Sequence, residues 1–341
     1  MTLPILDISD LRQNANSKAA RETAIQLRDI CHNQGFCYII GHGLAAQHVK
    51  LATAMQAFFD LPLSERKKIN LINSPHFRGY TVLGSELTGG QQDWRDQLDF
   101  GDEMPATRLA DSAPAWYNLR GPNQWPQAVP SLRPAVEDWM GGMYEVGMLI
   151  IRALAVGLGL RPDYFDNHFD PKGDARLKLI RYRVPESGST SQKYNQGVGW
   201  HNDTGFLTFI KQDKVGGLQV DIDGKIIDAT PISVAGENAL VMNLGEMLQV
   251  ATGGYLRATP HRVICPPPGV ERHSIAYFFN PKLEAKFAPI PLPPELAGAA
   301  HGAQNTDPND PVFNIVGANI LKTRLRAHPD VAAKYYGIKP A

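Results

Sequence analysis

One stretch of the sequence combines side chains that could bind a metal ion. In GVGWHNDTGFLTF, residues 197–209, His201 and Asp203 stand two positions apart. In an extended strand the side chains at positions i and i+2 point to the same face, so one imidazole and one carboxylate would converge on a single point. This pattern predicts two ligands of one metal ion.

The spacing needs support from its context, because the chain contains three His-x-Asp triplets. The triplets at His168 and His328 lie among turn-forming residues, and we expect both to be solvated loops. Only the triplet at His201 is followed by an apolar, β-prone run, FLTFI, and then by a second strand-like run, GGLQVDI. The context therefore favours His201 and Asp203.

A third ligand is available further along the chain, at His261 in ATPHRVI. Two histidines and one carboxylate form the facial set that suits Fe(II) and leaves open positions on one side of the ion. The alternative is that His261 is an ordinary hydrogen-bonded strand residue.

The next strand-like run carries a pair that could bind an anion. Arg272 and Ser274, in ERHSIAYF, are again two positions apart and form the only Arg-x-Ser triplet of the chain. A guanidinium beside a hydroxyl makes a site for a carboxylate. The alternative is a structural arginine paired with one of the chain's many acidic residues.

These segments, taken in order, resemble a known family. GWHNDTGFLTFIKQD, VGGLQV, NLGEMLQVATGGYLRATPHRV and RHSIAYFFNP are similar to the isopenicillin N synthase-like branch of the Fe(II) and 2-oxoglutarate-dependent oxygenases. PILDISDL, GFCYIIGHG and RGYTVLGSELTGGQQDWRDQLDFG are similar to the N-terminal region of that branch. The resemblance covers about residues 3 to 285.

The resemblance implies a metal centre, a cosubstrate and a reaction. It implies that Fe(II) is held by His201, Asp203 and His261. It also implies that 2-oxoglutarate chelates the ion and meets Arg272 and Ser274 with its distal carboxylate, with Tyr182 as a further donor. With O2, such an enzyme hydroxylates or desaturates a small-molecule metabolite and releases succinate and CO2.

The same resemblance implies a substrate pocket lined by the N-terminal loops, the mouth of the barrel and the C-terminal helix. The matching positions are Glu86, Thr88, Lys178, Thr204, Phe279 and Arg324. The alternative for these residues is ordinary polarity at the rim of a fold.

Three other functions stay open. An oxidase of the isopenicillin N synthase type uses no 2-oxoglutarate, and relatives of that kind also keep the Arg-x-Ser pair. GSELTGG is similar to a segment of bacterial ethylene-forming enzymes, although Thr204 replaces the aromatic residue that those enzymes place after the metal-binding aspartate. A barrel that binds metal without redox turnover, either a sensor or a zinc hydrolase, belongs to a different class.

The elements around these residues predict an α+β fold with a mainly β core. Strand-like runs recur every eight to twelve residues from Leu177, which is typical of a sandwich or barrel. The resemblance implies a double-stranded β-helix, or jelly roll, flanked by N-terminal helices and a C-terminal helix. We expect helices at about residues 17–32, 46–61, 131–160 and 313–326.

Four regions follow from this reading. They are 1–130, an N-terminal α/β oxygenase region with substrate loops; 131–170, a long support helix; 175–285, the double-stranded β-helix that binds Fe(II) and 2-oxoglutarate; and 286–341, a C-terminal segment with a lid helix.

Composition narrows the range of partners. The 341 residues carry no net charge, so we expect a small-molecule substrate and neither a nucleic acid nor a membrane partner. The sequence leaves the oligomeric state unknown.

The start of the chain lacks the segments of a signal peptide and the three cysteines lack zinc spacing, so we expect a cytoplasmic location. The most apolar stretch, from Met143, is interrupted by charges and predicts a buried helix.

Overall fold

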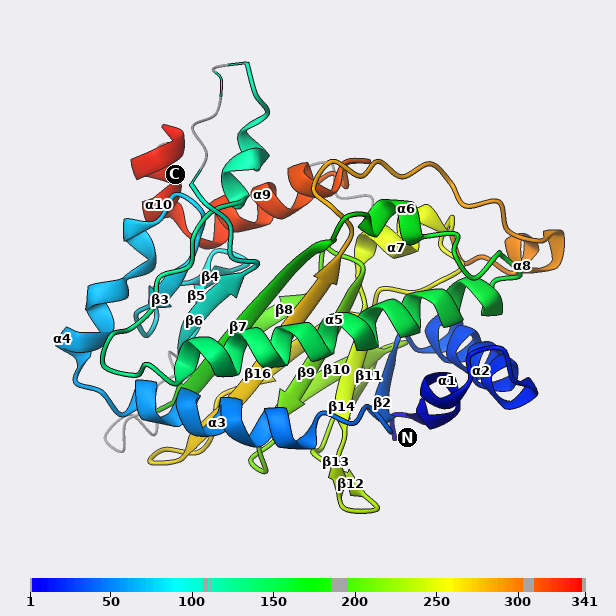
Figure 1. The fold of residues 1–341 in the computed structure, drawn as a ribbon, viewed down its shortest axis with the longest axis horizontal. Coiled ribbons are helices and arrows are strands. Elements are labelled where there is room, and N and C mark those ends of the chain that lie inside the picture. The colour runs from blue at the N-terminus through cyan, green and yellow to red at the C-terminus, as the bar shows by residue number, and fades with distance from the viewer. Residues whose placement is uncertain (1, 107–109, 111, 185–195, 303–309, 339–341) are drawn as a thin grey trace.

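Two β-sheets form the centre of the molecule (Figure 1). The computed structural model describes residues 2–106, 110, 112–184, 196–302 and 310–338. The larger sheet has eight strands, in the order β1 (Ile5–Asp7), β2 (Phe36–Ile40), β14 (Leu240–Leu244), β9 (Leu207–Gln212), β16 (Glu271–Asn280), β7 (Asp174–Arg183), β6 (Arg95–Gly101) and β3 (Gly79–Thr81). The smaller sheet has four, in the order β11 (Lys225–Asp228), β10 (Leu218–Ile222), β15 (His261–Ile264) and β8 (Gln196–His201). Two short pairs, β4 (Leu87–Thr88) with β5 (Gln91–Gln92) and β12 (Ser233–Val234) with β13 (Glu237–Asn238), lie outside these sheets.

Helices cover one face of the larger sheet. Helix α5 (Leu132–Gly157) runs across this face, with α2 (Lys18–Asn33) and α3 (Ala45–Phe59) packed beside it (Figure 1). By length and composition α5 could cross a membrane, but most of its apolar window is buried against the sheet and its neighbours. The predicted buried helix is thus present as part of the core.

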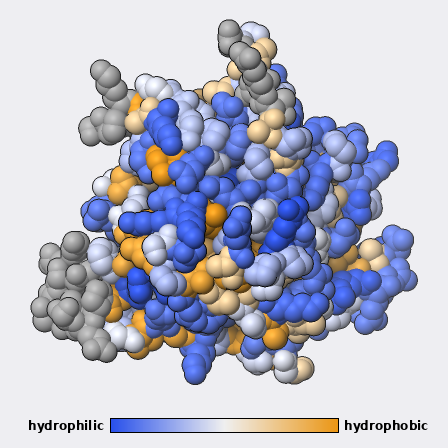
Figure 2. All heavy atoms as spheres, turned by 60° about the vertical axis from the view of Figure 1, so that its left-hand side comes forward, coloured by the Kyte–Doolittle hydropathy of each residue, from blue (hydrophilic) through white to orange (hydrophobic). Residues whose placement is uncertain are grey.

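The remaining helices are short or lie near the C-terminus. They are α1 (Ser9–Gln13), α4 (Leu63–Arg66), η1 (Lys67–Ile69), η2 (Leu71–Asn73), η3 (Ala115–Leu119), α6 (Asp166–Phe169), α7 (Glu246–Ala251), α8 (Pro294–Gly298), α9 (Val316–Ala327) and α10 (Pro329–Tyr336). The face that carries α4 and α10 is mostly hydrophilic, with smaller hydrophobic areas between the polar groups (Figure 2).

A hydrophobic layer lies between the two sheets. Ile180 and Ala276 of the larger sheet belong to the same buried cluster as Val198, Leu218 and Val263 of the smaller one. Most strand pairs are antiparallel, as a jelly roll requires. The predicted fold class is confirmed.

Three element predictions were wrong in detail. The run from Trp200 to Ile210 is two strands, because β8 ends at His201 and β9 begins at Leu207. The N-terminal region, in which we expected substrate loops, contains the strand β6, which is buried throughout and pairs with β7. The helix predicted over residues 313–326 begins only at Val316, and a second helix that was not predicted begins at Pro329, a residue whose missing N–H suits the first turn of a helix.

Candidate active site

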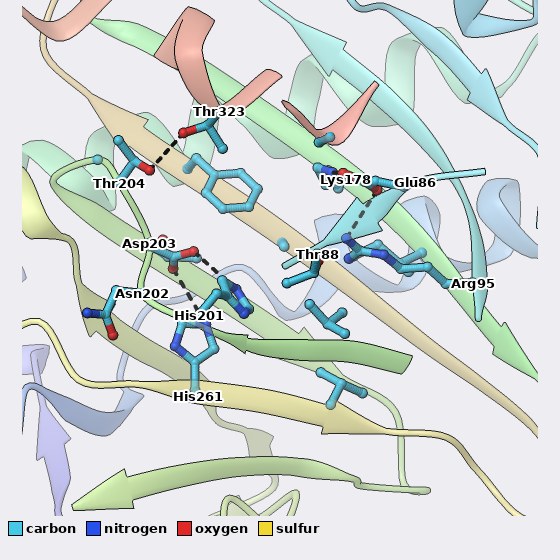
Figure 3. A pocket seen from close by; sticks show the side chains of 18 of the residues that line it. Glu86, Thr88, Arg95, Lys178, His201, Asn202, Asp203, Thr204, His261 and Thr323 are labelled. Carbon is cyan, nitrogen blue, oxygen red and sulfur yellow. Dashed lines mark hydrogen bonds and ion pairs between the residues drawn. The ribbon is translucent and has the colours of Figure 1, made fainter. Parts of the chain in front are cut away.

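Three potential metal ligands meet in a cavity between the sheets (Figure 3). His201 ends β8 and His261 begins β15, and the register of the smaller sheet pairs them directly. Asp203 lies just after β8, in the turn toward β9. The Nε2 atom of His201 is 3.7 Å from Oδ1 of Asp203, and Nε2 of His261 is 3.8 Å from Oδ2. Both gaps fit a single ion, since two bonds of about 2.1 Å span at most about 4.2 Å.

Backbone carbonyls orient both imidazole rings. Nδ1 of His201 lies 2.8 Å from the carbonyl oxygen of Gly199, and Nδ1 of His261 lies 3.2 Å from that of Thr259. A carbonyl can only accept, so each Nδ1 carries the proton and each Nε2 keeps its lone pair for a metal.

The loop that carries Asp203 is held from β14 and α7. Asn243 donates from Nδ2 to Oδ2 of Asp203 at 2.7 Å, and the N–H of Glu246 donates to the carbonyl of Asp203 at 2.8 Å. The two backbones meet at glycines, since a Cβ on Gly245 would collide with the carbonyl oxygen of Gly205. Such a close approach tolerates no side chain.

The protonation states suit a divalent cation. Burial opposes ionisation of Asp203, but His261, His201 and the hydrogen bond from Asn243 outweigh it and hold the pKa of this carboxyl below its usual value. Burial, together with nearby His201, lowers the pKa of His261 to about 4, so this ring is neutral at physiological pH. The donor set of carboxylate and imidazole fits Fe(II).

Asn243→Ala is expected to weaken Fe(II) binding by about 10- to 100-fold, because Asp203 loses the hydrogen bond that orients it. Anaerobic titration of the apoprotein against a chromogenic chelator would measure the affinity. Asn33→Ala, at the C-terminal end of α2 and away from the cavity, is the matched control. Equal affinities in the parent and both variants would show that Asn243 does not support the ligand.

A buried arginine lines the same cavity. Arg272 is 1% exposed, and its guanidinium carbon lies 4.7 Å from the ring centroid of Tyr182, its cross-strand partner. It donates to Gln212 at 3.0 Å, to Ser274 at 3.4 Å and to the carbonyl of Gly216. None of these partners among the described residues is a carboxylate, so the buried charge calls for an anionic ligand.

Most of the predicted substrate residues line this cavity, which has a volume of about 600 Å³. Five of the six predicted residues line it: Glu86, Thr88, Lys178, Thr204 and Arg324. Thr204 and Thr323 of α9 share a hydrogen bond of 2.9 Å (Figure 3). Helix α9 is thereby tied to the loop that carries Asp203.

The prediction for Phe279 was wrong by one position. Its ring stacks on Phe169 with centroids 4.7 Å apart and packs against Gly147 of α5, on the outer face of the sheet. Successive strand residues face opposite ways, and Phe278 is the one that lines the cavity.

These two phenylalanines are expected to respond differently to truncation. Phe279→Ala should lower the free energy of unfolding by about 3–5 kcal/mol, because it leaves a hole in the core. Phe278→Ala should cost clearly less stability and instead change substrate-dependent turnover. Denaturant unfolding of both variants measures the first effect. Equal destabilisation would mean that the register described for β16 is incorrect.

The other two His-x-Asp triplets are not solvated loops. His168 lies in α6 and stacks on Phe287, with ring centroids 4.8 Å apart. His328 is 2% exposed, and its Nε2 lies 3.6 Å from Oε1 of Glu86. Neither histidine lies among the three potential metal ligands.

Sequence reasoning also missed cavity residues. Arg176 lines the cavity together with Lys178, Ile180 and Tyr182, all on one face of β7. The alternation of strand side chains could have identified Arg176 once Lys178 and Tyr182 were assigned.

Comparison with known proteins places this geometry in a family. A family model described as "non-haem dioxygenase in morphine synthesis N-terminal" matches residues 3–128, and one described as "2OG-Fe(II) oxygenase superfamily" matches residues 164–281. The 2-oxoglutarate-dependent dioxygenase frbJ of Dothideomycetidae sp. (strain 11243) is 34% identical, over 98% of this chain and 92% of that protein. The chain belongs to the Fe(II) and 2-oxoglutarate-dependent oxygenases. Fe(II), 2-oxoglutarate and O2 are therefore its cofactor and cosubstrates.

Two further relatives resemble this oxygenase along most of its length. Homoarginine-6-hydroxylase 2-ODD-C23 of Glycine max is 30% identical, over 85% of this chain and 88% of that protein. The crystal structure of a full-length Neurospora crassa protein in complex with alpha-KG and 5-formyluracil aligns with a TM-score of 0.75 and 25% identity, over 94% of this chain and 95% of that one.

Proposed function

We propose that His201, Asp203 and His261 bind the Fe(II) of this dioxygenase. Arg272, with Ser274 and Tyr182, binds the distal carboxylate of 2-oxoglutarate. The observation that carries this assignment is that the three potential ligands line one cavity with a buried arginine that has no counter-ion among its described partners.

The substrate binds at the end of the cavity formed by β7, α9 and the β4–β5 hairpin. Glu86, Thr88, Lys178, Thr204 and Arg324 line the cavity, and Phe278 replaces Phe279 in the predicted set. We propose that these residues contact the substrate.

The family reaction consumes one 2-oxoglutarate and one O2, releases succinate and CO2, and hydroxylates or desaturates the substrate. An iron ion held by His201, Asp203 and His261 would keep positions open for the keto acid and for O2. Gln212 and Ser274 hold the Arg272 guanidinium in place, so the far carboxylate of the cosubstrate is fixed before reaction.

The alternatives from the sequence are weaker candidates. Family membership argues against a barrel that binds metal without redox turnover. The buried Arg272 argues for a carboxylate ligand but does not separate the dioxygenase from an oxidase of the isopenicillin N synthase type, which keeps the same Arg-x-Ser pair. The match to a 2-oxoglutarate-dependent dioxygenase along nearly the whole chain favours the dioxygenase. Ethylene formation stays a minor alternative, which a headspace measurement with arginine present would test.

The expectations about partners and location have different support. A small-molecule substrate agrees with the family. The absence of a nucleic acid partner gains no support, because one relative was solved with 5-formyluracil, a nucleobase. That absence, the absence of a membrane partner and a cytoplasmic location stay predictions.

A substrate screen that follows succinate and O2 together tests the function. Protein loaded anaerobically with Fe(II) and 2-oxoglutarate is exposed to O2 with each compound. We expect a substrate to stimulate succinate release and O2 uptake in equal amounts. Product formation that proceeds without 2-oxoglutarate would favour the oxidase instead.

A further inference from the structure

The substrate end of the cavity is surrounded by charged groups. Five cationic side chains and four carboxylates lie there, nearly all of them buried: Arg78, Arg95, Arg176, Lys178 and Arg324 against Glu86, Asp93, Asp99 and Asp174. His328 adds no charge at neutral pH, because burial lowers its pKa to about 4. Asp102 also acts on Arg78 but is paired with Lys172, so these described groups together carry one positive charge in excess.

The carboxylate of Glu86 is already paired with two cationic side chains of the protein. Its Oε1 accepts from Nζ of Lys178 at 2.6 Å, and its Oε2 lies 3.1 Å from Nη2 of Arg95 (Figure 3). Although burial opposes ionisation, these two cations hold the pKa of Glu86 below its usual value. A cationic substrate group would have to displace Lys178 to reach this carboxylate.

Two arginines of the cavity have donors to spare. Arg176 uses Nε and Nη2 on Asp174, at 2.7 and 3.0 Å, and its Nη1 has no partner among the described residues. Arg324 donates from Nη1 to Asp99 at 2.7 Å, and no described residue accepts from its other nitrogens. Both line the cavity. An anion could accept from both guanidinium groups.

Arg78, which lies next to Arg176, has no carboxylate partner of its own among the described residues and accounts for the excess positive charge. Arg78 lies over Gly101, the residue that β6 pairs with Arg176, so closely that a Cβ on this glycine would collide with Nη2 of Arg78. Arg78 donates to the carbonyl of Leu119 at 3.1 Å, and its Nε and Nη1 have no partner among the described residues. Burial and Arg176 lower its pKa to about 9, so it is still charged at neutral pH.

Resting on the proposed function, we propose that the substrate is a small carboxylic acid whose carboxylate binds between Arg176 and Arg324. Such a group supplies the negative charge that the cluster lacks, and a buried charge without compensation is costly. The rest of the substrate is largely apolar, because Leu87, Phe278 and Ile320 line the same cavity.

A matched series of probes tests the charge preference. The full chain, loaded anaerobically with Fe(II) and 2-oxoglutarate, is titrated with 3-phenylpropanoate, 3-phenylpropanamide and 3-phenylpropan-1-amine, and dissociation constants are read by equilibrium dialysis. We expect the acid to bind about 10- to 100-fold more tightly than the amide and the amine. An amine that binds as tightly as the acid, or an acid that does not bind, would overturn the proposal.

Amino-acid substitutions show which residues cause the preference for the acid over the amide and the amine. Arg176→Gln and Arg324→Gln should each remove most of the advantage of the acid, whereas Lys178→Met should favour the amine by releasing Glu86. Arg152→Gln, which breaks an exposed ion pair on α5, is the control. If Arg176→Gln fails to fold, Arg324→Gln decides alone. An unchanged preference in Arg324→Gln would rule out the assigned site.

The two proposals can fail separately. The visible absorption that appears when 2-oxoglutarate is added to the anaerobic Fe(II) protein is recorded first, on the same sample. If it appears and the acid shows no advantage, the substrate class is wrong and the cosubstrate site stands. If it is absent, the proposed function fails whatever the probes do.

Discussion

Asp203→Asn is expected to lower 2-oxoglutarate turnover by at least roughly 10³-fold, a loss typical of removing an essential catalytic group. The substitution keeps the size of the side chain but removes the negative charge between His201 and His261. An amide is a much poorer ligand for a divalent cation, and its NH2 group would face the donor from Asn243 if it took the place of Oδ2. Succinate release at saturating Fe(II) measures the loss, and bound iron measured on the same protein shows that the cause is the metal.

The control for this variant is Asp228→Asn, which removes an exposed carboxylate on β11. It should keep full activity and full iron content. Turnover within a few-fold of the parent in Asp203→Asn would mean that this carboxylate is not a ligand.

Arg272→Gln is expected to raise the 2-oxoglutarate concentration needed for half-maximal turnover by about 10²- to 10³-fold or more, since a carboxylate that loses its buried charged partner loses about 3–5 kcal/mol. Iron binding should be retained, because Arg272 makes no contact with His201, Asp203 or His261 in the described hydrogen bonds and ion pairs. Steady-state kinetics against 2-oxoglutarate measures the effect.

Arg262→Gln provides the comparison for Arg272. Arg262 lies on β15, where it covers the ring of Trp200, and it does not line the cavity. Its loss should leave the 2-oxoglutarate requirement unchanged. Similar requirements for the two variants would exclude Arg272 as the anchor of the cosubstrate.

The convergence of the metal-binding residues could be predicted from the sequence, although the local reason was only partly right. His201 and Asp203 do not share one strand, because β8 ends at His201 and Asp203 lies in the turn that follows. The pairing of His201 with His261 is set by the register between β8 and β15, which no local pattern shows.

The charged residues of the cavity were harder to predict, because β6 shows little of the alternation of apolar and polar residues that usually indicates a strand. Its sequence, RDQLDFG, carries polar side chains on both faces, since Asp96 faces Arg181 outside the sheet while Asp99 faces Lys178 inside. Hydrophobic alternation in this strand is limited to Leu98 and Phe100, which is too short to indicate a strand clearly. Arg95 was therefore hidden in a region that resembled loops. Asn243 was missed for a related reason: it ends an apolar run, ALVMNLG, without any motif of its own.

The most direct test of the metal centre is a crystal structure of the anaerobic complex with Fe(II) and 2-oxoglutarate, with anomalous diffraction measured at the iron edge. We predict one anomalous peak within about 2.0–2.2 Å of His201 Nε2, His261 Nε2 and an Asp203 oxygen, with the far carboxylate of 2-oxoglutarate on Arg272. A peak bound elsewhere, or a cosubstrate carboxylate away from Arg272, would contradict the assignment.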